Sequence, residues 1–205
     1  MLNAIYRKID WDGVINVGFD MDGTLYDEYE FIEQVYSEIN REIINDRKVL
    51  SFMLQRWLEK GSSYTHIFEE AYKLIDTSDY TQSEFIEHAL SIFRTYKPQL
   101  MLTTRNQQLL QYFRSKFNLF LITDGNTELQ QNKFHSLMLN KYFADNNVFF
   151  TGKYSPEYHK PNIKALDILG INHKKSVFFG DRRKDKEFAL SAGMQFQKVY
   201  NMVGV

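Results

Sequence analysis

Phe19-Asp20-Met21-Asp22-Gly23-Thr24-Leu25 is the stretch that decides the fold and the candidate site of this chain. It follows the apolar run Val14–Phe19, whose β-branched and aromatic residues predict a buried strand. In open α/β sheets, ligands bind just beyond the carboxyl ends of the strands. Because side chains alternate along a strand, we expect Asp20 and Asp22 to face the same side of that crevice. The alternative is a strand that simply ends in a polar turn, since Asp and Gly are common in turns.

The composition predicts a soluble globular protein with one domain, or one domain that carries a substantial insert. The chain has 205 residues, of which 43% are hydrophobic and 16% aromatic, enough to bury a core. A net charge of −1 gives no reason to expect a nucleic acid or an anionic membrane as partner. The absence of cysteine excludes thiolate chemistry and fits a cytoplasmic location. Neither a signal peptide nor an apolar run of about 18 residues is visible.

Residues 26–98 carry only helical periodicity. Apolar residues recur at three- and four-residue spacing in Glu28–Asn45, Val49–Leu58 and Tyr64–Ile75. Thr81-Gln82-Ser83-Glu84 is a capping box that predicts the start of a fourth helix, which ends before Pro98. This segment is therefore predicted to be an all-helical block.

Strands and helices alternate again after Pro98. The predicted strands are 119–123, 148–150, 176–179 and 196–200, and the predicted helices are 106–117, 127–140, 161–169 and 184–192. Continuous apolar strands that alternate with helices predict a parallel sheet covered on both faces. We therefore predict an α/β fold with a doubly wound, mainly parallel sheet. Residues 1–25 and 99–205 would form this Rossmann-like core, and residues 26–98 a helical cap inserted after its first strand.

Polar residues that suit phosphate follow the second predicted strand of the core. Thr123 offers a hydroxyl, Gly125 a free backbone N–H, and the helix predicted from Thr127 a positive end of its dipole. Asp124 lies between the first two, and either Asp124 or Asn126 could instead be an ordinary helix cap.

Two further sites fall on later loops. Lys160 precedes Pro161, at which a helix is expected to open, and could direct its ammonium at a phosphate or a carboxylate. A solvated loop lysine is the simpler interpretation of any single lysine. Asp181 follows the strand 176–179 as Asp20 follows the first strand, and Asp185 lies four residues later. Carboxylates are ligands that Mg²⁺ prefers, although Asp185 could merely complement a helix dipole.

These four sites, in this order, resemble the motifs of the haloacid dehalogenase superfamily, whose members are mostly phosphotransferases. The first motif is Asp20-Met21-Asp22-Gly23-Thr24, the second ends in Thr123, the third is Lys160, and the fourth is Gly180-Asp181 with Asp185. The position and helical nature of the insert look like the cap of the phosphoglycolate phosphatase-like and β-phosphoglucomutase-like branches.

The resemblance implies a Mg²⁺-dependent phosphatase in which Asp20 attacks phosphorus and forms an aspartyl-phosphate. Asp22 would protonate the leaving alcohol and then activate water, so its pKa is predicted to be raised while the metal keeps Asp20 ionised. Mg²⁺ would contact Asp20, the main-chain carbonyl of Asp22 and Asp181, with Asp185 nearby or bound through water. Thr123 and Lys160 would hold the phosphoryl oxygens, together with the Asp124-Gly125 loop.

The expected substrate is a small phosphorylated metabolite. Asp22 favours phosphate esters, because the true dehalogenases that this chain resembles lack the second aspartate. A sugar phosphomutase of the same family and a catalytically idle binding module remain as alternatives, and the oligomeric state stays open. Specificity is expected in the cap, where Arg56, Tyr64 and His66 could contact the substrate, although Tyr64 and His66 could simply start the next helix.

Overall fold

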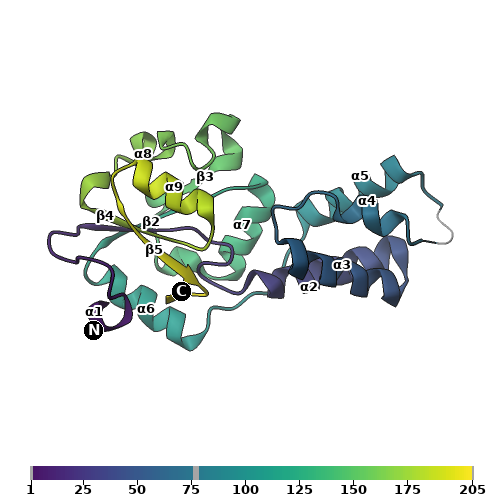
Figure 1. Ribbon diagram of the computed structural model, residues 1–205, viewed down its shortest axis with the longest axis horizontal. Helices are drawn as coiled ribbons and strands as arrows, with labels where there is room; N and C mark the ends of the chain where they lie inside the picture. The colour runs from purple at the N-terminus through teal and green to yellow at the C-terminus, as the bar shows by residue number, and fades with distance from the viewer. Residues whose placement is uncertain (1, 76–78, 205) are drawn as a thin grey trace. The chain divides into compact units, whose positions relative to one another are not determined.

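The computed structural model describes residues 2–75 and 79–204, and the chain divides into two compact units. The first unit comprises residues 1–28 and 100–205, and the second comprises residues 29–99. All the strands of the described residues belong to the first unit, whereas the second contains helices (Figure 1). None of the described helices is long and apolar enough to cross a membrane.

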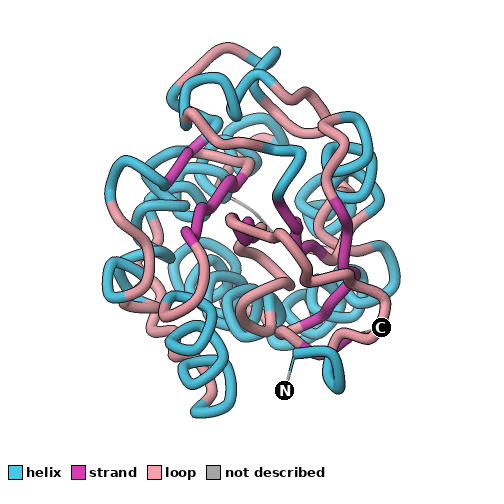
Figure 2. The backbone as a smooth tube through the Cα atoms, turned by 90° about the vertical axis from the view of Figure 1, so that its left-hand side faces the viewer, coloured by secondary structure: helices cyan, strands magenta, loops and turns pink. Residues whose placement is uncertain are grey.

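A six-stranded sheet with the order β3-β2-β1-β4-β5-β6 forms the centre of the first unit. The strands are β1 Asn16–Phe19, β2 Asn118–Thr123, β3 Val148–Phe150, β4 Ser176–Gly180, β5 Gln195–Tyr200 and β6 Val203–Gly204. Neighbouring strands are parallel except β5 and β6, which are antiparallel. Figure 2 shows the strands in magenta, with helices and loops around them. The predicted α/β fold with a mainly parallel sheet is confirmed, and β6 was not predicted because two residues carry no periodicity.

Helices cover both faces of this sheet. The α-helices of the first unit are α1 Leu2–Ile5, α6 Thr104–Arg114, α7 Thr127–Ser136, α8 Lys164–Leu169 and α9 Arg183–Ser191. Short 3₁₀ turns lie between them: η2 Leu139–Lys141, η3 Asp145–Asn147, η4 Thr151–Lys153, η5 Pro156–Tyr158 and η6 His173–Lys175.

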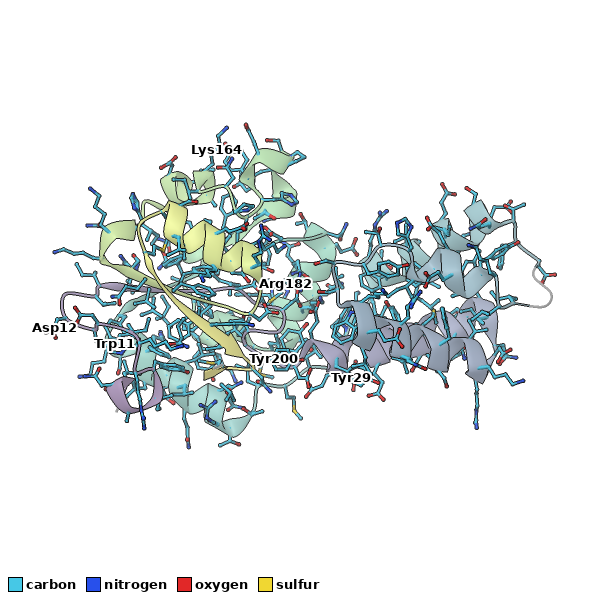
Figure 3. All side chains as sticks on the ribbon, in the orientation of Figure 1. Trp11, Asp12, Tyr29, Lys164, Arg182 and Tyr200 are labelled. Carbon is cyan, nitrogen blue, oxygen red and sulfur yellow. The ribbon has the colours of Figure 1, made fainter. Side chains whose placement is uncertain are left out.

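Adjacent phenylalanines of β4 show how the two faces are filled, because neighbouring side chains of a strand point in opposite directions. Phe178 packs with Phe188 of α9 at 5.0 Å between ring centroids. Phe179 packs on the other face with Phe113 of α6 at 5.5 Å. Trp11 extends this second cluster, with its ring 5.9 Å from that of Phe113 (Figure 3). The result is a helix–sheet–helix arrangement in which the strand ends of β1, β2 and β4 meet at one edge.

The second unit is held together by aromatic side chains on its helices. Its elements are α2 Glu28–Ile39, the π-helical turn η1 Asn40–Ile44, α3 Arg47–Lys60, α4 Ile67–Tyr72 and α5 Gln82–Thr95. The predicted capping box is confirmed at the start of α5, where Thr81 and Glu84 cap each other. Phe31 of α2 and Phe68 of α4 both pack on Phe93 of α5.

Candidate active site

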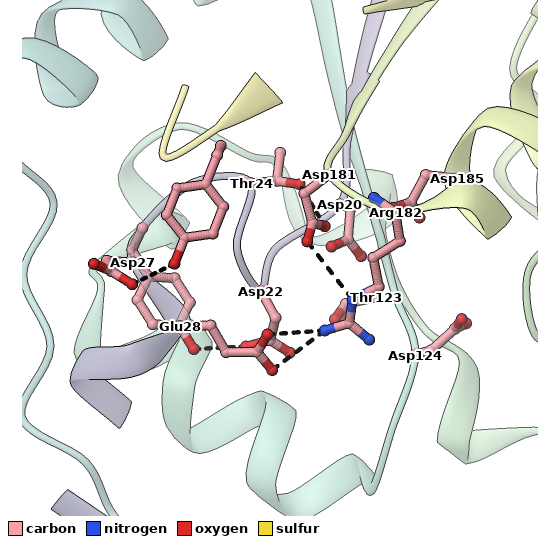
Figure 4. A network of polar contacts seen from close by, with 12 residues as sticks. Asp20, Asp22, Thr24, Asp27, Glu28, Thr123, Asp124, Asp181, Arg182 and Asp185 are labelled. Atoms are coloured by element: carbon pink, nitrogen blue, oxygen red, sulfur yellow. Dashed lines mark hydrogen bonds and ion pairs between the residues drawn. The ribbon is translucent and has the colours of Figure 1, made fainter. Parts of the chain in front are cut away.

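Asp20, Asp181 and Asp185 form an acidic cluster at the ends of β1 and β4. Each offers one carboxylate oxygen, and these oxygens lie within 4.8 Å of one another. Asp20 continues the pairing of its strand, because its backbone N–H donates to the carbonyl of Phe179 at 2.9 Å. Asp185 comes from the first turn of α9, and Gly180 allows it to approach, since a Cβ at 180 would lie 2.4 Å from the Cβ of Asp185. Figure 4 shows the three carboxylates together.

Lys160 lies inside this acidic cluster and has a fully buried side chain. Its ammonium is 2.5 Å from Oδ1 of Asp20 and 2.6 Å from Oδ1 of Asp185. Burial alone would lower the pKa of Lys160, but the carboxylates of Asp185 and Asp20 raise it above its ordinary value, so the side chain is charged. The sequence left two possible partners open for the Lys160 ammonium, a phosphate or a carboxylate. In the structure it contacts the carboxylates of Asp20 and Asp185.

The expected helix start at Pro161 is wrong. The helix α8 begins at Lys164, after a turn in which the backbone N–H of Asn162 donates to the carbonyl of His159. The Lys160–Pro161 peptide bond is cis. Lys160 is therefore placed by this turn and by Asp124, whose Oδ1 accepts from its backbone N–H at 3.2 Å.

The loop after β2 joins the site through both Thr123 and Asp124. Thr123 is buried, and its hydroxyl oxygen accepts a hydrogen bond from Gln130 at 2.6 Å. The side chain of Asp124 pairs with Lys184 at 2.7 Å in addition to its bond to Lys160. Of the two candidate caps for α7, the structure selects Asn126, whose side chain accepts from the backbone of Leu129.

Three donors that were not singled out in the sequence surround Asp22. Lys133 of α7 lies 2.8 Å from its Oδ1, and the hydroxyl of Tyr26 donates to the same oxygen at 2.6 Å. Gln130 donates to Oδ2 at 2.7 Å. Lys133 is only 3% exposed, so it is a buried cation within the helix predicted from Thr127. One signal in the sequence could have pointed to two of these donors. Gln130 and Lys133 lie one helical turn apart, shortly after the loop that is predicted to suit phosphate.

The predicted protonation pattern of the two aspartates is contradicted for Asp22. Burial alone would raise the pKa of Asp22, but the Lys133 ammonium and the hydrogen bonds from Lys133, Tyr26 and Gln130 lower it to about 2. Asp20 changes in the other direction: burial raises its pKa to about 8, because Lys160 offsets only part of the effect of burial and neighbouring carboxylates. The reason is that the second buried lysine lies beside Asp22, which the sequence pattern did not reveal.

Arg182 and Glu28 form an ion pair beside the acidic cluster. The guanidinium of Arg182 contacts both carboxylate oxygens of Glu28, at 3.0 and 3.2 Å, and lies 3.7 Å from Oδ2 of Asp181. Thr24 contacts the other oxygen of Asp181 at 3.4 Å. In Figure 4, Arg182 extends between Asp181 and Glu28, so it connects the loop after β4 with the first residue of α2.

The ion-paired network as a whole carries an excess of negative charge. Its members are six carboxylates, Asp20, Asp22, Glu28, Asp124, Asp181 and Asp185, and four cations, Lys133, Lys160, Arg182 and Lys184. When all are ionised, the network has two more negative than positive charges, because Lys160 and Arg182 each pair with two carboxylates. An excess of this size beside three clustered carboxylates fits a divalent cation with a preference for oxygen ligands.

In the second unit, Arg56, Tyr64 and His66 all pair with acidic residues of α4. Arg56 donates to both oxygens of Glu70, at 2.6 and 2.9 Å, and the Tyr64 hydroxyl donates to the same carboxylate at 2.5 Å. His66 contacts Glu69. The predicted helix from Tyr64 begins at Ile67 instead, so Tyr64 and His66 lie between α3 and α4, whereas Arg56 lies inside α3.

The chain was compared with known families and proteins. A family model described as haloacid dehalogenase-like hydrolase matches residues 16–193. A glyceraldehyde 3-phosphate phosphatase of Methanocaldococcus jannaschii is 28% identical over 192 residues, covering 86% of this chain and 80% of that protein.

Two solved structures share the fold at low sequence identity. A Thermotoga maritima protein described as a β-phosphoglucomutase has a TM-score of 0.64 at 21% identity, covering 89% of this chain and 84% of its own. A Bacillus subtilis protein described as a HAD hydrolase bound to magnesium also has a TM-score of 0.64, at 16% identity, covering 89% and 85%. At these identities the two structures support the fold alone.

Proposed function

Because the chain belongs to the haloacid dehalogenase-like hydrolase family, we propose that it is a Mg²⁺-dependent phosphatase of a small phosphorylated metabolite. The observation that carries this proposal is the junction of Lys160 with the acidic cluster of Asp20, Asp181 and Asp185. It unites a nucleophile, a cation for phosphoryl oxygens and oxygen ligands for a metal at the strand ends.

Asp20 is the proposed nucleophile. One of its carboxylate oxygens bonds to phosphorus while the bond from phosphorus to the leaving oxygen breaks, and Asp22 gives that oxygen a proton. Water then attacks the phosphorus of the aspartyl-phosphate and transfers a proton to Asp22, which releases phosphate and restores Asp20. Two steps of moderate barrier replace one difficult displacement.

Asp22 has to gain a proton before the first step, although its pKa is lowered in the free protein. A phosphate dianion that enters the site brings like charge close to the carboxylate, which favours its protonated form. Substrate binding would therefore prepare Asp22 for its proposed role, and its three donors would hold it in place meanwhile.

Asp20, Asp181 and Asp185, with the main-chain carbonyl of Asp22, are the groups proposed to hold Mg²⁺. The charge excess of the network and the raised pKa of Asp20 support this assignment, since a bound cation would favour the ionised nucleophile. The ion would supply positive charge to the phosphate oxygens. Asp185 is proposed to contact the ion directly or through water, while Lys160 and the backbone N–H of Arg182 hold its carboxylate.

Thr123 and Lys160 are proposed to contact the remaining phosphoryl oxygens, with backbone N–H groups of the Asp124-Gly125 loop. Lys160 is charged and buried at the nucleophile, which suits a role in charge stabilisation. The side chain of Asp124 is not proposed to contact phosphate, because it pairs with Lys184 and the backbone of Lys160. Its proposed contribution is to hold the loop rather than to bind an anion.

The name of the M. jannaschii relative supports a small phosphorylated substrate, and a triose phosphate is the first compound to test. The assay measures phosphate release from sugar phosphates, nucleoside monophosphates and phosphorylated acids, with Mg²⁺ and with a chelator. We expect metal-dependent turnover that Asp20→Asn abolishes. Asp12→Asn, an exposed aspartate before β1 whereas the site lies after its carboxyl end, is the matched control and should retain activity (Figure 3).

Two results would contradict the proposal. If Asp20→Asn were as active as wild type, Asp20 would not be the nucleophile. If turnover were the same in the chelator, the reaction would not depend on a metal. An isomerised sugar phosphate in place of free phosphate would instead identify a phosphomutase, and folded protein that binds Mg²⁺ without any turnover would favour a binding module.

Arg56, Tyr64 and His66 are retained as proposed specificity residues of the helical unit. Their present partners, Glu70 and Glu69, would have to exchange for substrate groups. Tyr64→Phe and His66→Asn should then raise KM for the preferred substrate with little change in kcat. If both variants keep the substrate ranking and KM of wild type, the three residues serve only to hold α3 against α4.

A further inference from the structure

We propose that Gln130 and Lys133, one turn apart on α7, are positioning residues that fix Asp22 and Thr123 in their reactive orientations. The inference rests on the proposed phosphatase function and adds residues to it. Neither side chain is expected to touch the phosphorus or the leaving group, so both would act through the residues that they hold.

The side chain of Asp22 is fixed from the α7 side. Lys133 lies 2.8 Å from Oδ1, and Gln130 donates to Oδ2 at 2.7 Å, so each residue orients one carboxylate oxygen. Gln130 and Lys133 are 2% and 3% exposed, and Asp22 is 7% exposed, so water hardly competes for these contacts. Tyr26 contributes a third donor, at 2.6 Å from Oδ1. A carboxylate bound in this way has little freedom to rotate away from a leaving group.

Gln130 also sets the direction of the Thr123 hydroxyl. The carboxylate of Asp22 can only accept hydrogen bonds, so the amide of Gln130 must present its nitrogen toward it. The same nitrogen lies 2.6 Å from Oγ1 of Thr123, which therefore accepts. The hydrogen of the hydroxyl is then left to donate elsewhere, as the binding of a phosphoryl oxygen requires.

A second contact ties Gln130 to the loop itself, because its amide nitrogen lies 3.1 Å from the main-chain carbonyl of Asp124. One side chain thus touches Asp22 from the first motif and two consecutive residues of the loop after β2. Since α7 starts directly after this loop, with Asn126 as its cap, the anchor and the loop are parts of one rigid element.

A purely structural role for Lys133 is the competing explanation. Burying an ammonium has a large desolvation cost, and an apolar side chain of similar length would fill the same space without it. A structural pair would stabilise the protein without regard to the substrate, whereas a positioning pair matters most when the leaving oxygen needs a proton. Leaving-group dependence therefore separates the two explanations.

The experiment compares Lys133→Met and Gln130→Met with wild type on two substrates. Glycerol phosphate has a poor leaving group that needs protonation, whereas para-nitrophenyl phosphate has a good one. In Lys133→Met we expect kcat/KM, which reports the step that forms the aspartyl-phosphate, to fall roughly a hundredfold for the alkyl ester and less than about threefold for the aryl ester. Gln130→Met should show a similar excess loss on the alkyl ester, in addition to an equal loss on both esters through its contact with Thr123. Asp22→Asn should show the same selectivity, and adding Lys133→Met to it should cause no further loss. Lys141→Met, an exposed lysine after α7, is the control.

Gln130→Met leaves no buried charge without a partner, so it keeps the test decisive if Lys133→Met does not fold. It should also weaken inhibition by inorganic phosphate about tenfold, because the Thr123 hydroxyl is no longer oriented. The absence of any excess loss on the alkyl ester in kcat/KM would overturn the positioning role. Wild type inactive on both esters and on every compound of the substrate panel would instead count against the proposed function, which keeps the two failures apart.

Discussion

Lys160 lies 140 positions after Asp20 in the chain, yet its ammonium contacts Oδ1 of that aspartate at 2.5 Å. The contact is possible because β1, β2 and β3 are parallel, so the segment after β3 that carries Lys160 starts at the same edge of the sheet as Asp20 after β1. The same ammonium also contacts Asp185, which lies in the first turn of α9, after β4. Lys160 therefore pairs with two buried carboxylates. Replacing one residue of this group should leave buried charges with fewer partners, which allows specific predictions.

Replacement of the buried Lys160 should severely reduce both stability and activity. Lys160→Met leaves Asp20 and Asp185 buried without their cation, which costs roughly 3–5 kcal/mol when one partner of a buried pair is lost. Urea unfolding in a chelator should show this loss, and phosphate release should fall by roughly a hundredfold or more. Lys164→Met is the matched control, because Lys164 is exposed and pairs only at the surface with Glu157 (Figure 3). Similar stability of the two variants would contradict the expectation.

Arg182 should stabilise the fold through Glu28. Arg182→Met leaves the mostly buried Glu28 carboxylate without its ion-pair partner, and we expect a loss of about 2 kcal/mol of unfolding free energy. Adding Glu28→Gln should recover much of the loss, because no buried charge then remains. The adjacent Arg183→Met is a demanding control: its side chain is 90% exposed, so stability should not change. Additive effects of Arg182→Met and Glu28→Gln would show that the two side chains do not interact.

Gly180 should be needed for the position of Asp185. In Gly180→Ala the new methyl group would collide with the Cβ and Cγ of Asp185, at 2.4 and 2.7 Å, and displace the start of α9. We expect Mg²⁺ affinity, measured by titration calorimetry, to fall at least about tenfold. In Gly204→Ala the methyl group would lie 3.5 Å from the side-chain nitrogen of Gln197, an ordinary contact distance, so this variant should bind as wild type does. Unchanged affinity in Gly180→Ala would mean that Asp185 does not take part in cation binding.

The metal-free protein should lose stability as the pH rises. The pKa of Asp20 is raised from its ordinary 3.8 to about 8, chiefly by burial. Between these values the folded state binds the proton that the unfolded state has released, so the unfolding free energy falls with increasing pH. Asp22, whose pKa is lowered to about 2, affects stability only in more acidic solution.

Urea midpoints at about pH 5 and about pH 8, measured in a chelator, test this sign. Wild type should be less stable at the higher pH, and the decline should be smaller in Asp20→Asn. Mg²⁺ should reverse the decline in wild type, because it binds the ionised form of the folded protein. If wild type and Asp20→Asn have the same dependence on pH, the titrating group is not Asp20.

Much of the architecture follows from local sequence patterns. Continuous apolar strands that alternate with helices predict a covered parallel sheet, and the order of the four motifs predicts the family, which the match over residues 16–193 confirms. The same rule predicts that acids directly after β1 and β4 come together, and Asp20, Asp181 and Asp185 do lie in one cluster. Patterns of this kind are local, and each strand end is defined by its own flanking residues.

The tertiary structure alone decided which charges are paired. Lys133 lies 111 positions from Asp22, and nothing in the helical pattern of α7 distinguishes a buried lysine from a surface one. A cation can be buried only where an anion meets it, and that depends on segments far apart in the chain. The direction of the Asp22 pKa shift and the contacts of Gln130 with Asp22 and Thr123 were decided in the same way. The sequence by itself determined the sheet and the acids at its edge, whereas the protonation of those acids depends on which distant cations the fold brings beside them.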